Sequence, residues 1–477
     1  MSRKYRWLAL APVLLAFLAV GGSAQAASAA TPFSITTNPG LAPSFTATTY
    51  DYAVRCAGHA TTTLSTVGTG TVTIGGHTFN EPVSLPLKLT PNMAVYVAGG
   101  GHIYTIRCLP ADFPAYASKV QGTPQAHGYL VGLAPGPASK GAHANYYVVS
   151  FDNHGVPVWW YANPSSPINA AFNGTGQIYW WLGSQATPGV GNGTYTIRNL
   201  NGTVVAAVGD PTAGTALDLH DFQVLPNGDY LGIQYVNTTA DLSSWGDSTT
   251  QPILDCVIVE LNPQGTIVWS WSTAAHVNLA AENANWHNLV PDVVHMNSIQ
   301  QVGNQIIWSA RALDAVYEID KTSGAVLWKI GGTPTPESLS VVGNTYPQVF
   351  SGQHDARRLS DGSITVHDDA TQEAGHPARA LRFTIDATAK TATVAEQVTD
   401  AFWPTPSFCC GSANKLPGGD WVTEWGYAPY TTELTPQGSP VIQINYYPYF
   451  SYRAAAVPVS SIALSQGMDA RFPPLHL

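Results

Sequence analysis

Three histidines and one arginine stand at comparable places in this sequence and could share one chemistry. His220 precedes the apolar segment FQVLPNGDYL, His295 begins HMNSI, and His354 precedes DARRL. Arg311 ends the segment IIWSAR, downstream of His295. An imidazole can be a nucleophile toward phosphoryl or sulfuryl groups, or a general acid or base near neutral pH. A guanidinium offers several N–H donors to a tetrahedral oxyanion. The set therefore predicts transfer of an anionic tetrahedral group.

Each of these residues also has an ordinary structural interpretation. A single histidine at the start of a strand is usually a loop residue with satisfied hydrogen bonds, and Arg311 could pair with Asp314 or Asp355 to brace the fold. The recurrence of histidine at one place in three successive units favours a shared site. Three imidazoles can also bind zinc or copper, so a metal-dependent hydrolase is an alternative. A cation as close as Arg311 disfavours a bound dication.

Four other residues bear on the predicted site. Asn297, two positions after His295, is a weaker candidate for a polar contact with a substrate. Three further histidines fall outside the repeated position and are predicted to be ordinary surface or loop residues: His287, His367 and His376. The prediction thus assigns catalysis to the three repeated histidines and Arg311, and substrate contacts to Arg311 and Asn297.

Repeated pairs of apolar segments must position these residues. Six copies of a segment–turn–segment phrase begin at Tyr146, Thr194, Val257, Val316, Arg379 and Thr431. A second phrase of the same kind, with turns such as PNGD and SDGS, precedes copies two to six, and HGYLVGLAP is a degenerate version before copy one. Units of about 50–60 residues with two hairpins each are typical of β-propellers, because one unit cannot bury its own apolar faces. The sequence predicts an all-β fold, with a six-bladed β-propeller over residues 127–455.

Residues 31–115 lack the repeated phrase and form a predicted domain of their own. Alternating segments such as TGTVTIGGHTF and HIYTIRC predict a small N-terminal β-sandwich, which a Cys56–Cys108 disulfide would close. Residues 116–126 read as a connector, and residues 456–477 as a C-terminal tail. Three cysteines remain: Cys256, Cys409 and Cys410. Either the adjacent pair is bonded to itself, or Cys256 pairs with one of its members.

The first thirty residues are predicted to be an export signal. Arg3, Lys4 and Arg6 precede an apolar run over residues 7–20, and AQA at residues 24–26 offers a small-residue cleavage site. We therefore expect a secreted or extracytoplasmic protein. Only 10% of residues are charged and the net charge is −10, which argues against nucleic acid or a membrane surface as partner.

Several longer sequence segments carry a family resemblance. They are HDFQVLPNGDYL, DVVHMNSI, IIWSARALDAVYEIDKTSGAVLWKIGG, FSGQHDARRL and SFCCGSANKLPGGDWVTEWG. With these segments, residues 120–455 resemble the bacterial arylsulfate sulfotransferase family, and more closely its secreted actinobacterial and fungal branch. The resemblance implies a six-bladed propeller with an N-terminal sandwich. It also implies transfer of a sulfuryl group from an aryl sulfate donor to a phenol acceptor, without a nucleotide donor, metal or other cofactor.

The resemblance further implies a ping-pong mechanism through a sulfohistidine. It assigns the nucleophile to His354, two assisting roles to His220 and His295, and sulfate binding to Arg311. Two other classes remain open from the sequence: a non-catalytic secreted propeller that binds a ligand, and a quinoprotein-like oxidoreductase, suggested by the tryptophan-rich turns. The oligomeric state is left open.

Overall fold

The computed structural model describes residues 32–136, 138–139, 144–187, 190–282, 290–373 and 375–477. Within them β-strands dominate, and the longest helix is α2 (Ser461–Arg471). This confirms the all-β prediction. None of the described helices has the length and apolar character that crossing a membrane requires. The predicted signal segment, residues 1–30, lies outside the described residues.

The N-terminal part consists of two sheets over a shared apolar core. The first sheet has the order β1 (Ser34–Asn38), β4 (Thr62–Val67), β7 (Val83–Leu87). The second has the order β2 (Leu41–Ala42), β3 (Asp51–Val54), β9 (His102–Cys108), β8 (Ala94–Gly99), β5 (Thr71–Ile74), β6 (His77–Asn80). Leu64 of the first sheet packs in one buried cluster with Val97 and Ile106 of the second. The predicted Cys56–Cys108 disulfide is confirmed and lies in this core.

Among the described residues after this part, six further sheets follow, and we give each in its spatial strand order. The first is β13 (Pro157–Asn163), β12 (Tyr146–Asp152), β11 (Gly128–Pro135), β35 (Tyr449–Ala456). The second is β14 (Ile168–Phe172), β15 (Ile178–Thr187), β16 (Val190–Arg198), β17 (Val204–Val208). The third is β18 (Phe222–Val224), β19 (Tyr230–Ala240), β20 (Gln251–Leu261), β21 (Ile267–Ser272).

The other three sheets continue the series. The fourth is β22 (Met296–Val302), β23 (Gln305–Ala310), β24 (Ala315–Asp320), β25 (Val326–Gly331). The fifth is β26 (Ser340–Val342), β30 (Thr391–Val398), β29 (Arg379–Asp386), β28 (Ile364–Asp368), β27 (His354–Arg358). The sixth is β10 (Ala117–Val120), β34 (Pro440–Asn445), β33 (Tyr430–Leu434), β32 (Trp421–Glu424), β31 (Ser412–Lys415).

The repeated phrases form the predicted hairpins. The six copies of the first phrase are the antiparallel pairs β12–β13, β16–β17, β20–β21, β24–β25, β29–β30 and β33–β34. In the first of them, Oδ1 of Asp152 accepts hydrogen bonds from the N–H groups of His154 and Val156, and Gly155 supplies the left-handed residue (φ 75°). This is the D-x-x-G turn chemistry that the sequence shows.

The first unit departs from the pattern. Its degenerate phrase forms only β11, which pairs with β12 on one side and with the C-terminal strand β35 on the other. A strand from the end of the chain thus completes the first sheet. The connector predicted over residues 116–126 contributes β10, which pairs with β34 in the sixth sheet.

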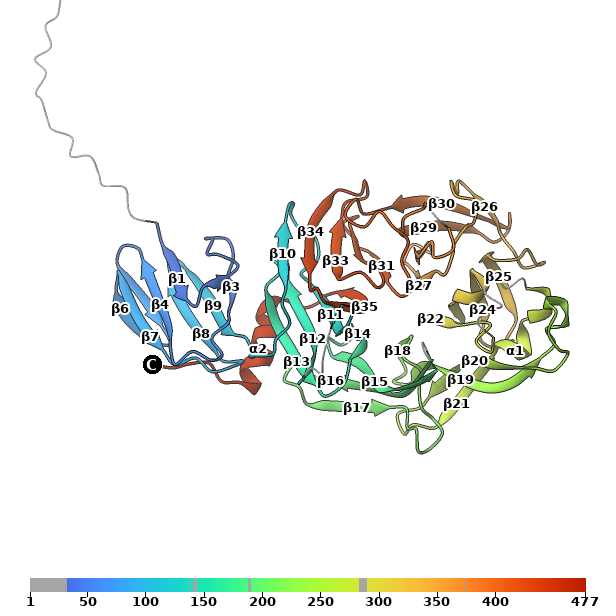
Figure 1. Ribbon diagram of the computed structural model, residues 1–477, viewed down its shortest axis with the longest axis horizontal. Helices are drawn as coiled ribbons and strands as arrows, with labels where there is room; N and C mark the ends of the chain where they lie inside the picture. The colour runs from blue at the N-terminus through green and yellow to red at the C-terminus, as the bar shows by residue number, and fades with distance from the viewer. Residues whose placement is uncertain (1–31, 137, 140–143, 188–189, 283–289, 374) are drawn as a thin grey trace, which may run out of the picture.

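The six sheets succeed one another around a common centre (Figure 1). Contacts link their inner strands: β35 with β14, β18 with β22, β22 with β27, β27 with β31, and β31 with β35. Apolar side chains fill the space between neighbouring sheets, as where the rings of Trp271 on β21 and Trp308 on β23 lie 5.5 Å apart. Residues at the starts of the inner strands are therefore brought toward the same central region.

The C-terminal segment connects the two parts of the molecule. On one side of α2, Asp469 pairs with Arg107 of β9 at 2.8 Å. On the other, Arg471 donates to the carbonyl of Trp160 on β13 at 2.8 Å. Helix α2 thus holds the N-terminal sheets against the first of the six sheets.

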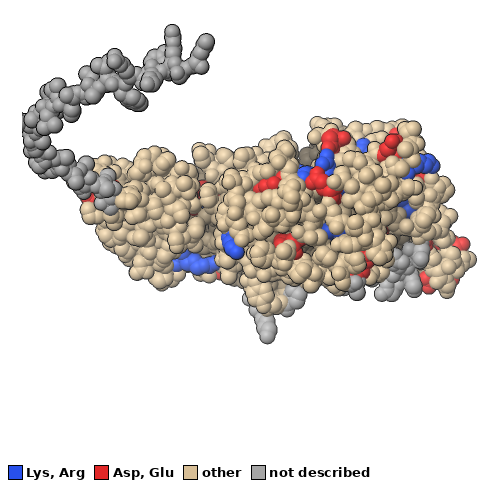
Figure 2. Space-filling view, turned by 90° about the horizontal axis from the view of Figure 1, so that it is seen from above, with Lys and Arg blue, Asp and Glu red and all other residues tan. Residues whose placement is uncertain are grey.

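On the face seen in Figure 2, the described acidic and basic side chains are few and interspersed.

Candidate functional site

The three repeated histidines occupy the predicted positions. His220 lies two residues before β18, His295 immediately before β22, and His354 is the first residue of β27. These are the inner strands of the third, fourth and fifth sheets. His295 has a φ of 52°, a left-handed conformation that few non-glycine residues adopt and that is common at functional sites.

His220 and His295 form a pair. Their ring centroids are 4.7 Å apart and the rings are nearly perpendicular, at 79°. Each ring is held through Nδ1 by its own aspartate: His220 by Asp218 at 2.5 Å, and His295 by Asp292 at 2.5 Å. A carboxylate at Nδ1 places the proton there, so that Nε2 becomes the acceptor nitrogen.

Burial affects the charge of His295 and of its aspartate. It lowers the pKa of His295, although the Asp292 carboxylate opposes the shift. Burial alone would raise the pKa of Asp292, but the His295 imidazole beside it lowers that pKa below its usual value. The geometry therefore favours an ionised Asp292 that orients a neutral imidazole.

His354 is the most enclosed of the three, with 1% of its surface exposed. Its Nδ1 lies 2.8 Å from Oδ2 of Asp369 and 2.9 Å from the carbonyl oxygen of Gly352. Its Nε2 accepts a hydrogen bond from the backbone N–H of Cys410 at 3.3 Å. Burial lowers the pKa of His354 to about 4, with the Arg311 and His220 charges adding to the effect and Asp369 opposing it. The imidazole is thus neutral at physiological pH, with its lone pair on Nε2.

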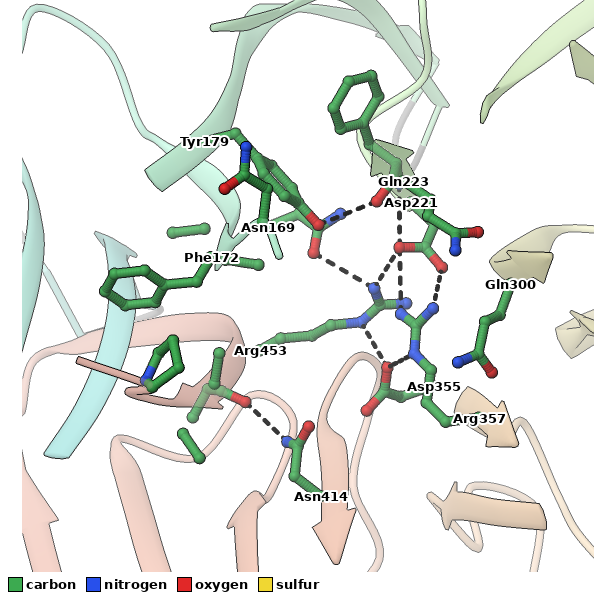
Figure 3. A pocket seen from close by; sticks show the side chains of 18 of the residues that line it. Asn169, Phe172, Tyr179, Asp221, Gln223, Gln300, Asp355, Arg357, Asn414 and Arg453 are labelled. Atoms are coloured by element: carbon green, nitrogen blue, oxygen red, sulfur yellow. Dashed lines mark hydrogen bonds and ion pairs between the residues drawn. The ribbon is translucent and has the colours of Figure 1, made fainter. Parts of the chain in front are cut away.

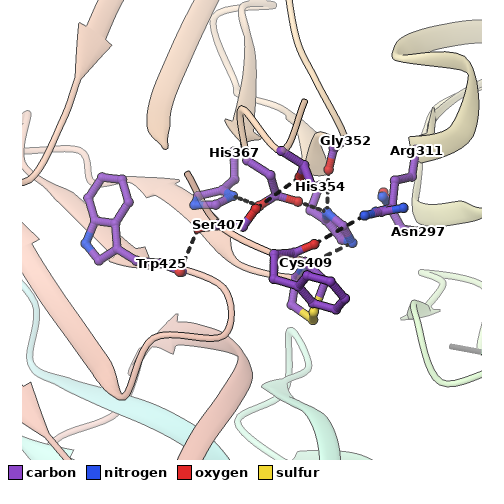
Figure 4. The surroundings of a disulfide bond; sticks show 12 residues. Asn297, Arg311, Gly352, His354, His367, Ser407, Cys409 and Trp425 are labelled. Carbon is purple, nitrogen blue, oxygen red and sulfur yellow. Dashed lines mark hydrogen bonds and ion pairs between the residues drawn. A yellow bond between two sulfur atoms is a disulfide. The ribbon is translucent and has the colours of Figure 1, made fainter. Parts of the chain in front are cut away.

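Arg311 lies beside these rings. It follows β23, and its backbone N–H donates to the carbonyl of His295 at 3.0 Å. Its Nη2 donates to the carbonyl of Phe408 at 3.2 Å. Its charge contributes to the lowered pKa values of both His295 and His354. Figure 4 shows the guanidinium approaching the His354 ring next to the Cys409–Cys410 disulfide.

Asn297 is buried close to these groups. Its Nδ2 donates to the backbone carbonyl of Gln353 at 2.7 Å, and its backbone carbonyl accepts from Arg453 at 2.6 Å. Its Oδ1 is buried without a hydrogen-bond partner among the described residues. Asn297 thus links β22 to the residue before His354, and its polar contact with a substrate stays a prediction.

The prediction for His367 was wrong. His367 lies on β28, is fully buried, and its Nδ1 is 3.0 Å from Oδ1 of Asp369. Asp369 therefore lies between His354 and a second imidazole, which packs against Trp425 at 5.8 Å between ring centroids. His376 contacts the ring of Tyr346 instead. His287 lies outside the described residues.

Sequence reasoning missed five residues of the site: Asp218, Asp292, Asp369, Cys410 and Tyr452. The first two lie two and three positions before their histidines, and that spacing could have revealed them. Tyr452, on β35, lies between two site histidines, with ring centroids 5.7 Å from His220 and 6.2 Å from His354. Its hydroxyl is buried without a hydrogen-bond partner among the described residues.

A buried charge network lies next to the histidines. Asp221 and Asp355 directly follow His220 and His354 in the chain. Arg453 pairs with Asp221 at 2.8 Å, and Arg357 pairs with Asp355 at 2.8 Å (Figure 3). The four residues border a cavity of about 510 Å³ that the three histidines do not line. Because its charges are paired, the network braces the inner strands.

The cysteines outside the N-terminal sheets take the first of the two predicted arrangements. Cys409 and Cys410 are bonded to each other, and Cys256 is a buried free thiol. Among the described residues, no three His, Cys, Asp or Glu side chains are grouped so as to hold a metal ion.

Comparisons with known proteins identify one family. A family model described as arylsulfotransferase (ASST) matches residues 170–447, which include all the predicted site residues. No curated protein matches the chain. Two solved structures are similar in part. A Bacteroides caccae protein of unknown function has 12% identity and a TM-score of 0.42, over 70% of this chain and 100% of its own. A Myceliophteria thermophila Cps50 (Swd1) β-propeller domain has 9% identity and a TM-score of 0.36, over 70% and 91%.

Proposed function

Because this chain belongs to the arylsulfotransferase family, we propose that it moves a sulfuryl group from a phenolic sulfate ester to a phenol, through a covalent adduct on His354. Small-molecule aryl sulfates and phenols are thus its proposed substrates, and no nucleotide donor takes part. The enclosed, neutral imidazole of His354 is the observation that carries the proposal. Its Nδ1 is fixed by Asp369, its pKa is lowered to about 4, and its Nε2 faces the side on which Arg311 lies.

The first half-reaction breaks the ester. The Nε2 lone pair of His354 attacks sulfur, the bond from sulfur to the aryl oxygen breaks, and its electrons remain on that oxygen. The leaving oxygen takes up a proton. A ring of the His220–His295 pair that carries a proton on Nε2, besides the one that its aspartate holds on Nδ1, can donate it. Asp369 stabilises the positive charge that develops on the His354 ring, as an orienting carboxylate does in other His-based sites.

The second half-reaction restores the histidine. A phenol enters and loses its proton to the same histidine pair, and its oxygen attacks sulfur as the N–S bond breaks. The bonding electrons return to Nε2 of His354. In both half-reactions the guanidinium of Arg311 holds sulfuryl oxygens by charge-assisted hydrogen bonds. These hydrogen bonds are strongest in the transition state.

One experiment tests the reaction. Purified protein is mixed with 4-nitrophenyl sulfate and a second phenol, with and without a chelator, and both released nitrophenol and the new sulfate ester are measured. We expect acceptor-dependent release that His354→Ala abolishes. A folded protein that is inactive on a broad panel of aryl sulfates would instead be a binding module, and activity lost on chelation would indicate a metal-dependent hydrolase.

We also propose an architecture and a location. The ring of six sheets supports a six-bladed β-propeller, with β35 completing the first blade and the two N-terminal sheets forming a β-sandwich domain. The Cys56–Cys108 disulfide is compatible with an oxidising compartment and so supports export. Sequencing the N-terminus of the protein recovered from culture medium tests the location. Cleavage near residue 26 supports export, and an intact N-terminus on cytoplasmic protein contradicts it.

A further inference from the structure

The segment over residues 407–411 touches the proposed site at three points. The N–H of Cys410 donates to Nε2 of His354 at 3.3 Å, and the carbonyl of Phe408 accepts from Arg311 at 3.2 Å. The N–H of Gly411 donates to the carbonyl of Tyr452 at 2.9 Å. A short stretch of backbone is thus bonded to the attacking atom, to the sulfate-binding group and to a neighbouring aromatic residue.

The backbone at Cys410 is held in an uncommon conformation. Its φ is 72°, in the left-handed region that is unfavourable for most residues and that glycine adopts freely. The bond from Cys410 to Cys409 closes a small ring around the peptide that joins them. Because that peptide carries the N–H directed at His354, the disulfide fixes the direction of the donor. Cys410 is also buried, with 8% of its surface exposed, so water does not compete well for the N–H.

We infer that the backbone N–H of Cys410 is a catalytic donor to the sulfuryl group, held in place by the Cys409–Cys410 disulfide. This inference rests on the proposed function. Before reaction, the N–H donates to the Nε2 lone pair. As that lone pair forms the bond to sulfur, the N–H loses its acceptor while the three sulfuryl oxygens arrive around it. The hydrogen bond then passes to one of those oxygens.

The transfer of this hydrogen bond favours the transition state over the bound ester. A donor aimed where negative charge accumulates, in a site without water, strengthens as the charge develops. In the proposed reaction Arg311 holds the sulfuryl group through its side chain, whereas Cys410 offers a fixed backbone dipole. The Phe408 carbonyl, on the same segment, positions Arg311 itself. The disulfide segment therefore organises both donors around the atom that His354 attacks.

Two double variants separate the donor from the disulfide. Cys409→Ala/Cys410→Ala removes the covalent ring and leaves alanine at φ 72°, so the backbone should relax and the N–H should turn away. Cys409→Ala/Cys410→Gly also removes the ring, but glycine tolerates the left-handed conformation. Cys56→Ala/Cys108→Ala, which removes the disulfide of the N-terminal sheets, is the matched control.

The rate of sulfuryl transfer under saturating donor is the main measurement. We expect kcat to fall roughly 100-fold in the alanine variant, the loss typical of one missing oxyanion donor, with KM changed only a few-fold. The kcat of the glycine variant should be at least about tenfold higher than that of the alanine variant. The control should match the wild type at temperatures where the control is folded. Thermal melts and circular dichroism confirm folding of each variant.

A second readout does not depend on turnover. Diethyl pyrocarbonate modifies neutral imidazoles, and mass analysis locates the label on His354. We expect faster labelling of His354 in the alanine variant, because Nε2 no longer accepts a hydrogen bond, and near wild-type labelling in the glycine variant. If the alanine variant does not fold, the glycine variant and wild-type protein reduced by a phosphine provide the same comparison.

The outcomes are distinguishable. An active wild type whose two variants match it in kcat and labelling overturns the role of the Cys410 N–H and leaves the proposed function standing. Two folded variants that are equally inactive show that the sulfur atoms, not the N–H, are required, and also overturn the inference. A wild type inactive on every donor overturns the proposed function, and the inference with it.

Discussion

Oδ2 of Asp369 lies 2.8 Å from Nδ1 of His354, and both side chains are sealed from solvent. The contact keeps the imidazole proton on Nδ1, so that Nε2 carries the lone pair on the side where Arg311 lies. Burial alone would raise the pKa of Asp369, but the adjacent His354 and His367 imidazoles hold it below its usual value. An ionised carboxylate is therefore in place to support the proposed nucleophile.

Replacing that carboxylate tests the relationship. Asp369→Asn keeps the size of the side chain but removes its charge and disturbs the tautomer of His354. We expect the rate of adduct formation to fall by roughly two to four orders of magnitude, as in other sites where an amide replaces the orienting carboxylate. Single-turnover kinetics with excess enzyme measure it.

Asp368→Asn is the matched control, because Asp368 is equally buried and pairs with Arg379 at 2.8 Å instead. It should lower thermal stability while leaving adduct formation per folded molecule within about tenfold of the wild type. Equal rate losses in the two variants would show that Asp369 only supports the fold.

The pH dependence of adduct formation should reflect the enclosed nucleophile. The pKa of His354 is lowered to about 4, and below that pH Nε2 is protonated and has no lone pair for sulfur. We therefore expect the His354 adduct to form at a rate that persists as pH falls through 6.5, the ordinary histidine value, and declines only toward about 4. Rapid quench with mass analysis of the peptide around SGQHDAR follows it, and a midpoint near the ordinary value would contradict an enclosed, neutral His354.

Stability should change over the same pH window. In the unfolded chain His354 takes up a proton near its ordinary pKa of 6.5, whereas in the folded protein it does so only near 4. The unfolded state therefore binds more protons between these values, and stability is lost as pH falls from 6.5 to about 4. His354→Gln removes this contribution. Denaturant titrations of both proteins across the window should show a smaller loss in the variant, and parallel curves would contradict the lowered pKa.

Much of this arrangement could be predicted from the sequence, because repetition carries positional information. His220, His295 and His354 occupy one place in three successive units, and equivalent places in a ring of sheets converge. The pairing of Cys409 with Cys410 was one of two open choices, because sequence spacing alone did not exclude a bond to Cys256. These predictions depend only on local pattern and on the packing of repeated units.

The other residues of the site are positioned by the pairing of the last strand with the first sheet and by packing between residues distant in the sequence. Tyr452 enters the site because the last strand, β35, pairs with β11 of the first sheet, and no local pattern marks that partner. Asp369 reaches His354 across the hairpin of β27 and β28, where the register shifts between residues 354 and 357. His367 was misjudged for the same reason. It lies opposite His354 on the neighbouring strand of the same sheet, not at an equivalent repeat position.

The His220–His295 pair should matter most for poor leaving groups. If the pair donates a proton to the departing oxygen, His220→Ala and His295→Ala should slow donors with weakly acidic phenols far more than 4-nitrophenyl sulfate, whose phenolate leaves without assistance. We expect losses of roughly 100-fold or more for the former and about tenfold or less for the latter. A series of substituted phenyl sulfates measures the slope against phenol acidity, and variants whose slope equals that of the wild type would contradict proton donation.

Arg311 should contribute both to binding of the sulfuryl group and to stabilisation of the transition state. Arg311→Lys keeps the positive charge but loses the planar set of donors, and the two are not equivalent where two oxygens are held at once. We expect kcat/KM to fall by roughly 100-fold or more, which corresponds to about 3 kcal/mol of transition-state stabilisation, with a small change in thermal stability. Arg379→Lys is the control, because Arg379 is buried and pairs with Asp368, so its loss should cost stability and little turnover. Thermal melts and steady-state rates on both variants separate the roles. Intact turnover in Arg311→Lys would show that Arg311 serves the fold alone.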